Sequence, residues 1–264
     1  MPGRDGGMQR FDAELQALAM EERARPRATI DPVDGKKPFA GLAIVIPAYG
    51  EAGSVGSVVR TLRELYPDAM VVVVDDGSRD ATSDVACAAG AYVVRHPINL
   101  GQGAALHTGI RHAIRRGAAL VCTFDADGQH DATSIGAMRR VLHERDVDVV
   151  LGSRFLAEKQ NVPPFRRFML KLALAFTRLH TRLSLTDTHN GLRLMTSHAA
   201  MLMLPRQAGM AHASEMLDLL ASHRLRYAEI PSAVEYTEYS KRKGQRSSNA
   251  VKVVLELAYR RLTR

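Results

Sequence analysis

The sequence has few of the features that build disulfide-rich or membrane-spanning proteins. It contains only two cysteines, and Cys87 and Cys122 each lie among small or apolar residues, which indicates buried thiols in a reducing compartment rather than a disulfide framework or a metal pair. No run approaches the roughly 20 uninterrupted apolar residues that span a bilayer, and the polar start MPGRDGGMQR lacks a signal-peptide core. We expect a cytoplasmic protein, soluble or peripheral on the cytoplasmic face of a membrane.

Aromatic residues are also scarce, at 5% of the chain, and no nucleic-acid-binding motif is present. A basic nucleic-acid-binding module is therefore only a remote alternative. The formal charge of +8 favours an anionic partner such as a phosphate or an acidic membrane face; a basic composition without a charge-dependent role is the other reading. Apolar residues make up 46% of the chain, which is enough for one large domain with a core or for two small ones.

Five short apolar runs alternate with helical stretches from residue 41 onward. The runs are rich in β-branched residues and apolar throughout, which is typical of strands covered on both faces of a parallel sheet; they span 42–46, 70–74, 91–94, 119–124 and 147–151. Helices are predicted near 53–65, 80–89, 101–116 and 132–144. This alternation predicts a doubly wound, mostly parallel α/β domain over residues 39–248. Residues 1–38 read as an N-terminal extension, and 249–264 as a C-terminal amphipathic helix.

Polar motifs follow four of the predicted strands directly. They are IPAYGE (46–51), DDGS (75–78), DADGQH (125–130) and GSRF (152–155). Taken singly, each is consistent with ordinary turn and helix-cap residues. Ligands of doubly wound sheets bind at the carboxyl ends of the strands, so four such motifs at one sheet edge favour a shared site in one crevice.

Several other sites fit the motifs poorly. A calcium loop starting at Asp125 needs a glutamate at its twelfth position, where Gly136 stands. The segment GQGAAL (101–106) lacks the third glycine of a dinucleotide fingerprint, and the chain has no Walker A lysine. His130 has no second histidine or cysteine at zinc-ligand spacing, so a turn or a supporting role is expected for it and for Asp131.

In their order and spacing, IPAYGE, VVDDGSRDAT, NLGQGAAL, DADGQH and GSRF resemble the inverting family 2 glycosyltransferases of GT-A fold. The later segments TDTHNGLRLM, HASEM and YTEYS–KGQ are most similar to the branch that contains dolichyl-phosphate mannose synthase and bacterial polyprenyl-phosphate glycosyltransferases. The resemblance covers about Leu42 to Gln245. It implies metal-dependent, inverting transfer of a hexose from a GDP- or UDP-sugar to a polyprenyl or dolichyl phosphate.

The resemblance implies a donor site that neutralises a diphosphate. Mg²⁺ or Mn²⁺ is expected because all candidate ligands are oxygen donors: Asp127 first, then Asp125, at the metal or the ribose, and Gln129. The remaining donor-side candidates are Pro47, Tyr49, Glu51, Asp75, Asp76, Arg154, Arg193, Lys243 and Arg246. Plain packing is the alternative for Tyr49, and a solvated loop for the segment with Arg246, where relatives often carry serine.

The acceptor determines whether the reaction needs a base. A sugar hydroxyl must lose a proton during attack, and Glu215 stands where related enzymes carry such an acid. A polyprenyl phosphate is already ionised, and Glu215 would then bind sugar or a basic neighbour. Transfer to a soluble sugar or protein hydroxyl is therefore the alternative function. Asp187 and Asn190 are acceptor-side candidates, with a structural turn as the alternative.

Two basic amphipathic segments, 163–183 and 249–264, are expected to lie at an anionic membrane surface or to pack on the core. Many polyprenyl-linked relatives continue into transmembrane helices, whereas this chain stops. Peripheral membrane contact or a separate membrane subunit is therefore expected to bring the lipid acceptor. The sequence gives no indication of the oligomeric state.

Overall fold

The computed structural model describes residues 41–156, 183–188, 190–209 and 211–232. The predicted extension 1–38, nearly all of segment 163–183, the predicted helix 249–264 and the loop residues Lys243 and Arg246 lie outside the described residues. None of the helices in the described ranges combines the length and apolar character needed to cross a bilayer.

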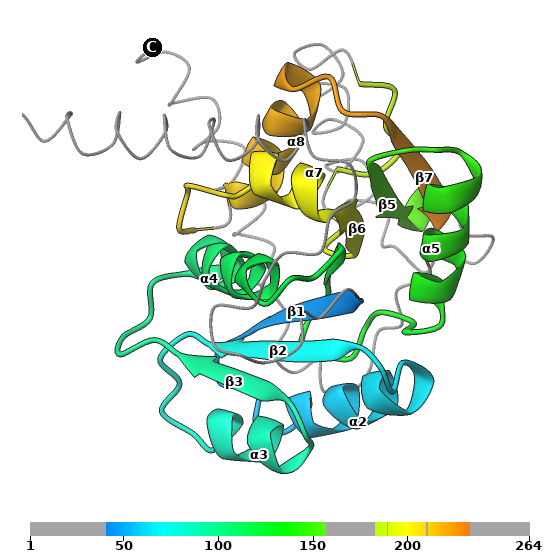
Figure 1. Cartoon of the computed structure of the whole chain (residues 1–264). Coiled ribbons are helices and arrows are strands. Elements are labelled where there is room, and N and C mark those ends of the chain that lie inside the picture. Colours follow the sequence, from blue (N-terminus) through cyan, green and yellow to red (C-terminus); the bar gives the residue numbers. More distant parts are fainter. Residues whose placement is uncertain (1–40, 157–182, 189, 210, 233–264) are drawn as a thin grey trace, which may run out of the picture.

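A seven-stranded mixed sheet forms the centre of the fold, in the order β3-β2-β1-β4-β6-β5-β7 (Figure 1). Its strands are β1 (Leu42–Ala48), β2 (Met70–Asp75), β3 (Tyr92–Arg95), β4 (Leu120–Thr123), β5 (Val149–Ser153), β6 (Arg193–Thr196) and β7 (Tyr227–Pro231). Neighbouring strands run parallel except at β6, which is antiparallel to β4 and β5. The predicted α/β fold with a mostly parallel sheet is confirmed.

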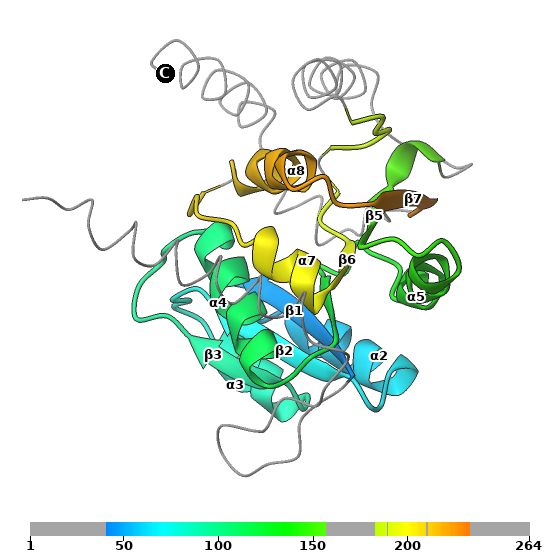
Figure 2. The same ribbon diagram turned by 45° about the horizontal axis from the view of Figure 1, so that its top comes forward.

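Helices cover both faces of the sheet (Figure 2). One face carries α2 (Val55–Leu65), α3 (Thr82–Ala88) and α5 (Ser134–Glu144). The other carries α4 (Gln102–Arg115), α7 (Ser197–Leu202) and α8 (His212–Ser222), and a short 3-10 helix, η1 (Arg154–Leu156), follows β5. The four helices predicted between the first five strands are confirmed, with ends that differ from the prediction by two or three residues at most.

The strands are apolar on both faces because each face meets a helix layer. In β1, Ala43 and Val45 pack in the layer of α4, whereas Ile44 and Ile46 pack in the layer of α2. Side chains of a strand alternate between the two faces, so a polar residue at either set of positions would be buried. The unbroken apolar run LAIVI is the consequence.

Helix α4 lies unusually close to the sheet at Gly109. A Cβ atom at this position would lie 2.3 Å from Cγ1 of Val45 and 3.0 Å from Cγ2 of Val74. Glycine therefore lets α4 settle against β1 and β2, and the amino end of α4 then reaches the sheet edge where both strands end.

Candidate functional site

Acidic residues follow three strands that lie side by side in the sheet. Glu51 follows β1, Asp75 and Asp76 end β2, and Asp125 and Asp127 follow β4. The expectation of carboxylates at three adjacent strand ends is therefore confirmed. Because parallel strands place their carboxyl ends at one edge, these groups form an acidic edge, the name we use below for these five residues.

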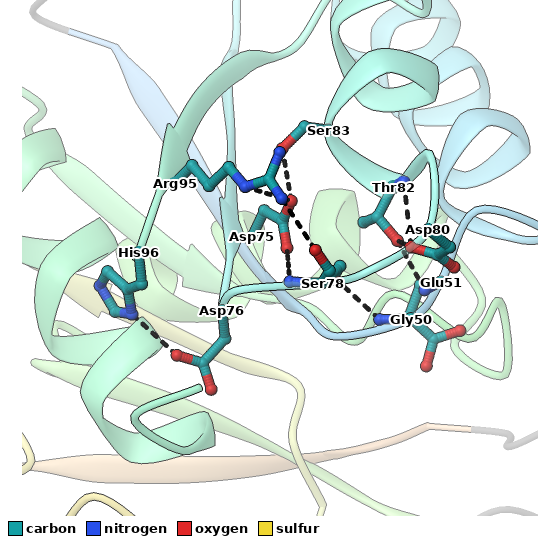
Figure 3. Close-up of polar contacts among 10 residues, drawn as sticks. All are labelled: Gly50, Glu51, Asp75, Asp76, Ser78, Asp80, Thr82, Ser83, Arg95 and His96. Carbon is teal, nitrogen blue, oxygen red and sulfur yellow. Dashed lines mark hydrogen bonds and ion pairs between the residues drawn. The ribbon is translucent and has the colours of Figure 1, made fainter. Parts of the chain in front are cut away.

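Asp75 is a fully buried carboxylate that holds the turn after β2 (Figure 3). Its Oδ1 accepts a hydrogen bond of 2.9 Å from the backbone N–H of Ser78, its Oδ2 accepts one from the Ser83 hydroxyl, and Nε of Arg95 lies 3.7 Å from Oδ2. Burial raises the pKa of Asp75, but the hydrogen bonds and the arginine outweigh it and hold the pKa below its ordinary value. Asp75 is therefore an ionised anchor of this turn.

Asp76 connects the end of β2 to the start of α4. Its Oδ1 lies 2.8 Å from Nδ1 of His96 and accepts a 2.9 Å hydrogen bond from the N–H of Leu100, and its Oδ2 accepts one of 2.7 Å from the N–H of Gly101. The ring of His96 also contacts Thr108, with Nε2 2.9 Å from Oγ1. Both carboxylate oxygens of this predicted nucleotide-binding residue are engaged within the protein.

The loop after β1 is tied to the segment after β2 by three backbone N–H groups, of which Figure 3 shows those of Gly50 and Glu51. Gly50 N–H donates to Oγ of Ser78 at 2.9 Å, and Glu51 N–H donates to Oγ1 of Thr82 at 2.8 Å. Ala52 N–H donates to Oδ2 of Asp80 at 3.3 Å. These contacts fix where Glu51 lies relative to β2.

The other β1 candidates differ in their exposure. Pro47 is buried inside the strand, where it pairs in register with Val74. Tyr49 follows the strand and is 49% exposed, so it is not a core residue. Its role at the donor site stays a prediction.

Asp125 is held by side chains from two elements. Its Oδ2 lies 2.8 Å from Nε2 of His130, and its Oδ1 accepts a 3.4 Å hydrogen bond from Nε2 of Gln102, the first residue of α4. The ring of His130 is nearly buried and packs edge-on against Phe124, with centroids 5.5 Å apart. The supporting role expected for His130 thus takes the form of a direct contact with the carboxylate.

Asp127 has a different environment from Asp125. Its Oδ1 accepts a 3.0 Å hydrogen bond from the backbone N–H of Gln129. Burial and the charge of Asp125 raise the pKa of Asp127. Burial also acts to raise the pKa of Asp125, but the hydrogen bond from His130 and the nearby positive charges lower it overall. A cation between the two would relieve the repulsion that raises the pKa of Asp127.

The donor set fits a Mg²⁺ or Mn²⁺ ion that completes its shell with substrate oxygens. Asp125 and Asp127 offer carboxylates and Gln129 an amide oxygen, all hard ligands. Within the described residues, no group of three or more His, Cys, Asp or Glu side chains is placed to enclose a metal on its own. Mg²⁺ commonly binds in this way, through one or two carboxylates together with phosphates of the substrate.

Arg154 and Asp187 form a buried ion pair on the other side of β6. Arg154 Nε and Nη2 donate to Oδ2 and Oδ1 of Asp187 at 2.7 and 2.9 Å, and the Asp187 carboxylate is almost fully buried. The loop with Asp187 is held by Glu229 of β7, whose carboxylate accepts the N–H groups of Thr186 and Asp187. The predicted phosphate ligand and the predicted acceptor-side acid are therefore partners.

Arg193, at the start of β6, is enclosed rather than open. Its side chain is directed toward α8, where Nη1 lies 2.7 Å from Sδ of Met216 and Nη2 donates to the carbonyl of Ala213 at 3.3 Å. Burial lowers the pKa of Arg193 to about 10, against the opposing pull of Asp125 and Asp187. Arg193 therefore places a buried positive charge near both Asp125 of the acidic edge and Asp187 of the ion pair with Arg154.

Two further candidates hold the backbone around them. Glu215 lies in the first turn of α8, as expected, and its Oε2 accepts hydrogen bonds of 3.0 and 2.9 Å from the N–H groups of Arg206 and Gln207. Asn190 is buried, and its Oδ1 accepts the N–H of Leu192 at 3.0 Å, while its Nδ2 has no hydrogen-bond partner in the described part of the chain. The turn reading of Asn190 therefore has direct support, beside its expected acceptor-side role.

Comparison with known proteins identifies the family. Residues 43–202, more than half of the chain, match the family described as glycosyl transferase family 2. The chain belongs to this family. The glycosyltransferase is 29% identical to the UDP-N-acetylglucosamine–dolichyl-phosphate N-acetylglucosaminyltransferase of Methanococcus voltae, over 76% of this chain and 88% of that protein. It is 31% identical to the undecaprenyl-phosphate mannosyltransferase of Micrococcus luteus, over 56% of this chain and 63% of that protein.

The fold of the glycosyltransferase is also found in solved structures. It is similar to glucosyl-3-phosphoglycerate synthase of Mycobacterium tuberculosis, with a TM-score of 0.64, 20% identity, and coverage of 84% of this chain and 80% of that chain. A structure of that enzyme contains Mn²⁺, uridine diphosphate and phosphoglyceric acid. The likeness shows a GT-A-type fold, and the family resemblance drawn from the motifs is confirmed.

The sequence did not indicate several residues that shape the glycosyltransferase site. His96, Gln102 and Gly191 all contact the acidic edge. Gln102 and Gly191 stand within the quoted segments NLGQGAAL and TDTHNGLRLM, but none of the three is among the predicted site residues. The available signals were weak: Gln102 follows a glycine at a predicted helix start, and Gly191 follows Asn190 in a turn-like sequence. Contacts of this kind depend on which segments the fold brings together.

Proposed function

We propose that the chain catalyses metal-dependent, inverting transfer of a hexose from a GDP- or UDP-sugar to a polyprenyl phosphate. The observation that carries the proposal is the acidic edge, where Asp125 and Asp127 lie beside the residues that end β1 and β2. The names of the relatives agree, since one uses a UDP-sugar and both transfer sugar to a lipid phosphate. Residues 39–248 would act as the catalytic domain, in peripheral contact with the membrane.

On the donor side, Asp127 is the principal ligand in this proposal. Among the described residues, Asp125 is contacted by the side chains of His130 and Gln102, whereas the hydrogen bond from Gln129 N–H to Asp127 engages Oδ1 and not Oδ2. A bound Mg²⁺ or Mn²⁺ would supply positive charge to the leaving diphosphate. Asp75 and Asp76 then position the backbone turns that line the nucleotide site. Their carboxylate oxygens can accept further hydrogen bonds from the nucleotide.

On the acceptor side, the geometry favours a nucleophile that needs no base. A phosphate oxygen attacks as an anion, so it needs positioning and charge neutralisation. Oε2 of Glu215 binds two backbone N–H groups, which suits a loop anchor better than a proton acceptor. Arg193 contributes a buried positive charge near Asp125 and Asp187. Arg154 stays a candidate phosphate ligand in this proposal, with its guanidinium paired to Asp187.

The test is a screen of GDP- and UDP-sugars against a polyprenyl phosphate, with and without Mn²⁺, with the product read by mass spectrometry. We expect a polyprenyl-phosphate-linked hexose only with the metal. Asp127→Ala should lower the affinity for the Mn²⁺–nucleotide at least tenfold in calorimetry, while the matched control Asp131→Ala, at an exposed position, should bind as the parent does. Unchanged donor affinity in Asp127→Ala would refute the assignment.

Glu215→Gln distinguishes the two acceptor classes. Glutamine keeps an oxygen that can accept the N–H groups of Arg206 and Gln207, but it cannot take up a proton at neutral pH. Turnover on polyprenyl phosphate should therefore survive this change. Near-complete loss of turnover, with the fold intact, would instead favour a soluble sugar or protein hydroxyl as the acceptor and Glu215 as the base.

A further inference from the structure

Gly191 lies directly against the carboxylate of Asp125. A Cβ atom at position 191 would lie 2.5 Å from Oδ2, 2.8 Å from Oδ1 and 2.9 Å from Cγ of Asp125, and these are the three nearest atoms. Carbon and oxygen atoms without a bond or hydrogen bond between them stay farther apart than this. The Asp125 carboxylate therefore occupies the space that a side chain at position 191 would need.

Neither partner in this contact can easily move away. Asp125 is held by Nε2 of His130 at 2.8 Å and by Nε2 of Gln102 at 3.4 Å. The carbonyl of Gly191 accepts a 2.6 Å hydrogen bond from Oγ1 of Thr123, the last residue of β4. Gly191 is thus held by β4 at Thr123, and Asp125 follows Thr123 by two residues.

The chain after Gly191 is fixed as well. Its next residue, Leu192, is fully buried, donates its N–H to Oδ1 of Asn190 at 3.0 Å and accepts the N–H of Gly152 at 3.0 Å. Arg193 then pairs in register with Thr123 and Leu151. A methyl group at position 191 must therefore displace the carboxylate or strain the entry into β6.

We propose that Gly191 is a positioning residue whose bare Cα fixes the place of the Asp125 carboxylate beside Asp127. This deepens the proposed function and rests on it for the ligand. The contact also joins the segment of Asp187 and Asn190, on the predicted acceptor side, to the carboxylates on the donor side. A substitution at Gly191 acts on donor binding through Asp125, without touching the donor.

A double-mutant cycle in thermal unfolding tests the contact without any substrate. Gly191→Ala should lower Tm by about 4 °C or more in the parent. In the Asp125→Ala background the same change should lower Tm by less than about 1 °C, because the three nearest atoms are gone. Gly209→Ala is the matched control, since a Cβ there meets no atom of the described residues within 4 Å. If Gly191→Ala lowered Tm equally in the parent and in the Asp125→Ala variant, the proposal would be overturned.

The cycle remains decisive if Gly191→Ala does not fold. Recovery of folded protein in Asp125→Ala/Gly191→Ala would support the proposal, because removing the carboxylate then relieves the methyl group. If Asp125→Ala folds and the double variant does not, the cost arises elsewhere in the strand entry, and the proposal is wrong. The full chain is used in every arm.

Calorimetry with Mn²⁺ plus UDP, and with Mn²⁺ plus GDP, tests the consequence for binding. For whichever nucleotide the parent binds, affinity should fall at least tenfold in Gly191→Ala and stay at the parent value in Gly209→Ala. Parent-like affinity in Gly191→Ala overturns the positioning role alone. If the parent binds neither nucleotide, the proposed function is wrong and the positioning role falls with it.

Discussion

His212 gives a pH dependence that can be worked out from its environment. It is the first residue of α8, 5% exposed, and its Nδ1 donates to the carbonyl of Gly209 at 2.9 Å. Burial lowers its pKa from 6.5 to about 4, with Arg193 of β6 acting in the same direction and the Gly209 carbonyl and Asp125 in the opposite one. The folded protein therefore holds this histidine neutral.

The sign and size of the effect follow from proton linkage. Below pH 6.5 the unfolded chain binds a proton at His212 that the folded protein does not bind until about pH 4, so stability is full above pH 6.5 and is lost as the pH falls toward 4. With these two pKa values, the loss between pH 7 and pH 5 is about 2 kcal/mol. This corresponds to roughly 4–8 °C in Tm.

Urea unfolding at pH 7 and pH 5 measures this difference. In His212→Asn, which keeps a side-chain donor for the Gly209 carbonyl and does not titrate, the drop between the two pH values should be smaller than in the parent by about 2 kcal/mol. His143→Asn, at an exposed position of α5, is the matched control for removing a histidine. An equal drop in His212→Asn and the parent would refute the reasoning.

Three further changes probe the packing and the ion pair by urea unfolding. Gly109→Ala should lower the free energy of unfolding by about 1–3 kcal/mol, because its methyl group would meet Val45. Arg154→Ala should cost about 3–5 kcal/mol, because it removes the guanidinium from the buried carboxylate of Asp187. Thr82→Val should cost about 1–3 kcal/mol, because the fully buried hydroxyl then no longer accepts the Glu51 N–H.

The glycine and arginine changes each have a control in the same protein. Of the described residues, a methyl group at position 136 meets only the Tyr66 hydroxyl, at 3.6 Å, so Gly136→Ala should leave the free energy of unfolding unchanged or raise it by up to about 1 kcal/mol. Arg226→Ala breaks an exposed pair with Asp146, so it should lower the free energy of unfolding far less than Arg154→Ala does. If Gly136→Ala lost as much stability as Gly109→Ala, the packing argument would be contradicted. If Arg226→Ala lost as much stability as Arg154→Ala, the burial argument would be contradicted.

Most of the sheet was predictable because four of its first five strands, β1, β2, β4 and β5, are buried almost throughout. Runs such as MVVVV at 70–74 have no other stable place in a soluble fold. The strands that the sequence did not reveal, β6 and β7, are short and contain Arg193 and Glu229, whose polar side chains interrupt the apolar pattern. Those side chains are buried by contacts with α8 and with the loop around Asp187, which local patterns do not encode.

The site was predictable as a set of strand ends but not as a set of contacts. Asp125 and Asp127 were identified by their place after an apolar run, and the fold brings them to the expected edge. The sequence did not predict that Arg154 pairs with Asp187, 33 residues away, although it indicated both as candidates. Residues far apart in sequence meet only through the complete fold, so spacing identifies the participants and leaves their partners open.

The antiparallel strand β6 explains how the two halves of the site are arranged. If β5 paired directly with β4, Arg154 would follow a strand next to that of Asp127. Instead β6 lies between them and runs the other way, so its amino end, with Gly191 and Arg193, enters the sheet at the edge where β4 and β5 end. One segment thereby contacts Asp125 and brings a buried positive charge between the acidic edge and the Arg154–Asp187 pair. The segment that enters β6 therefore contributes Asp187 to one set of residues and Gly191 to the other.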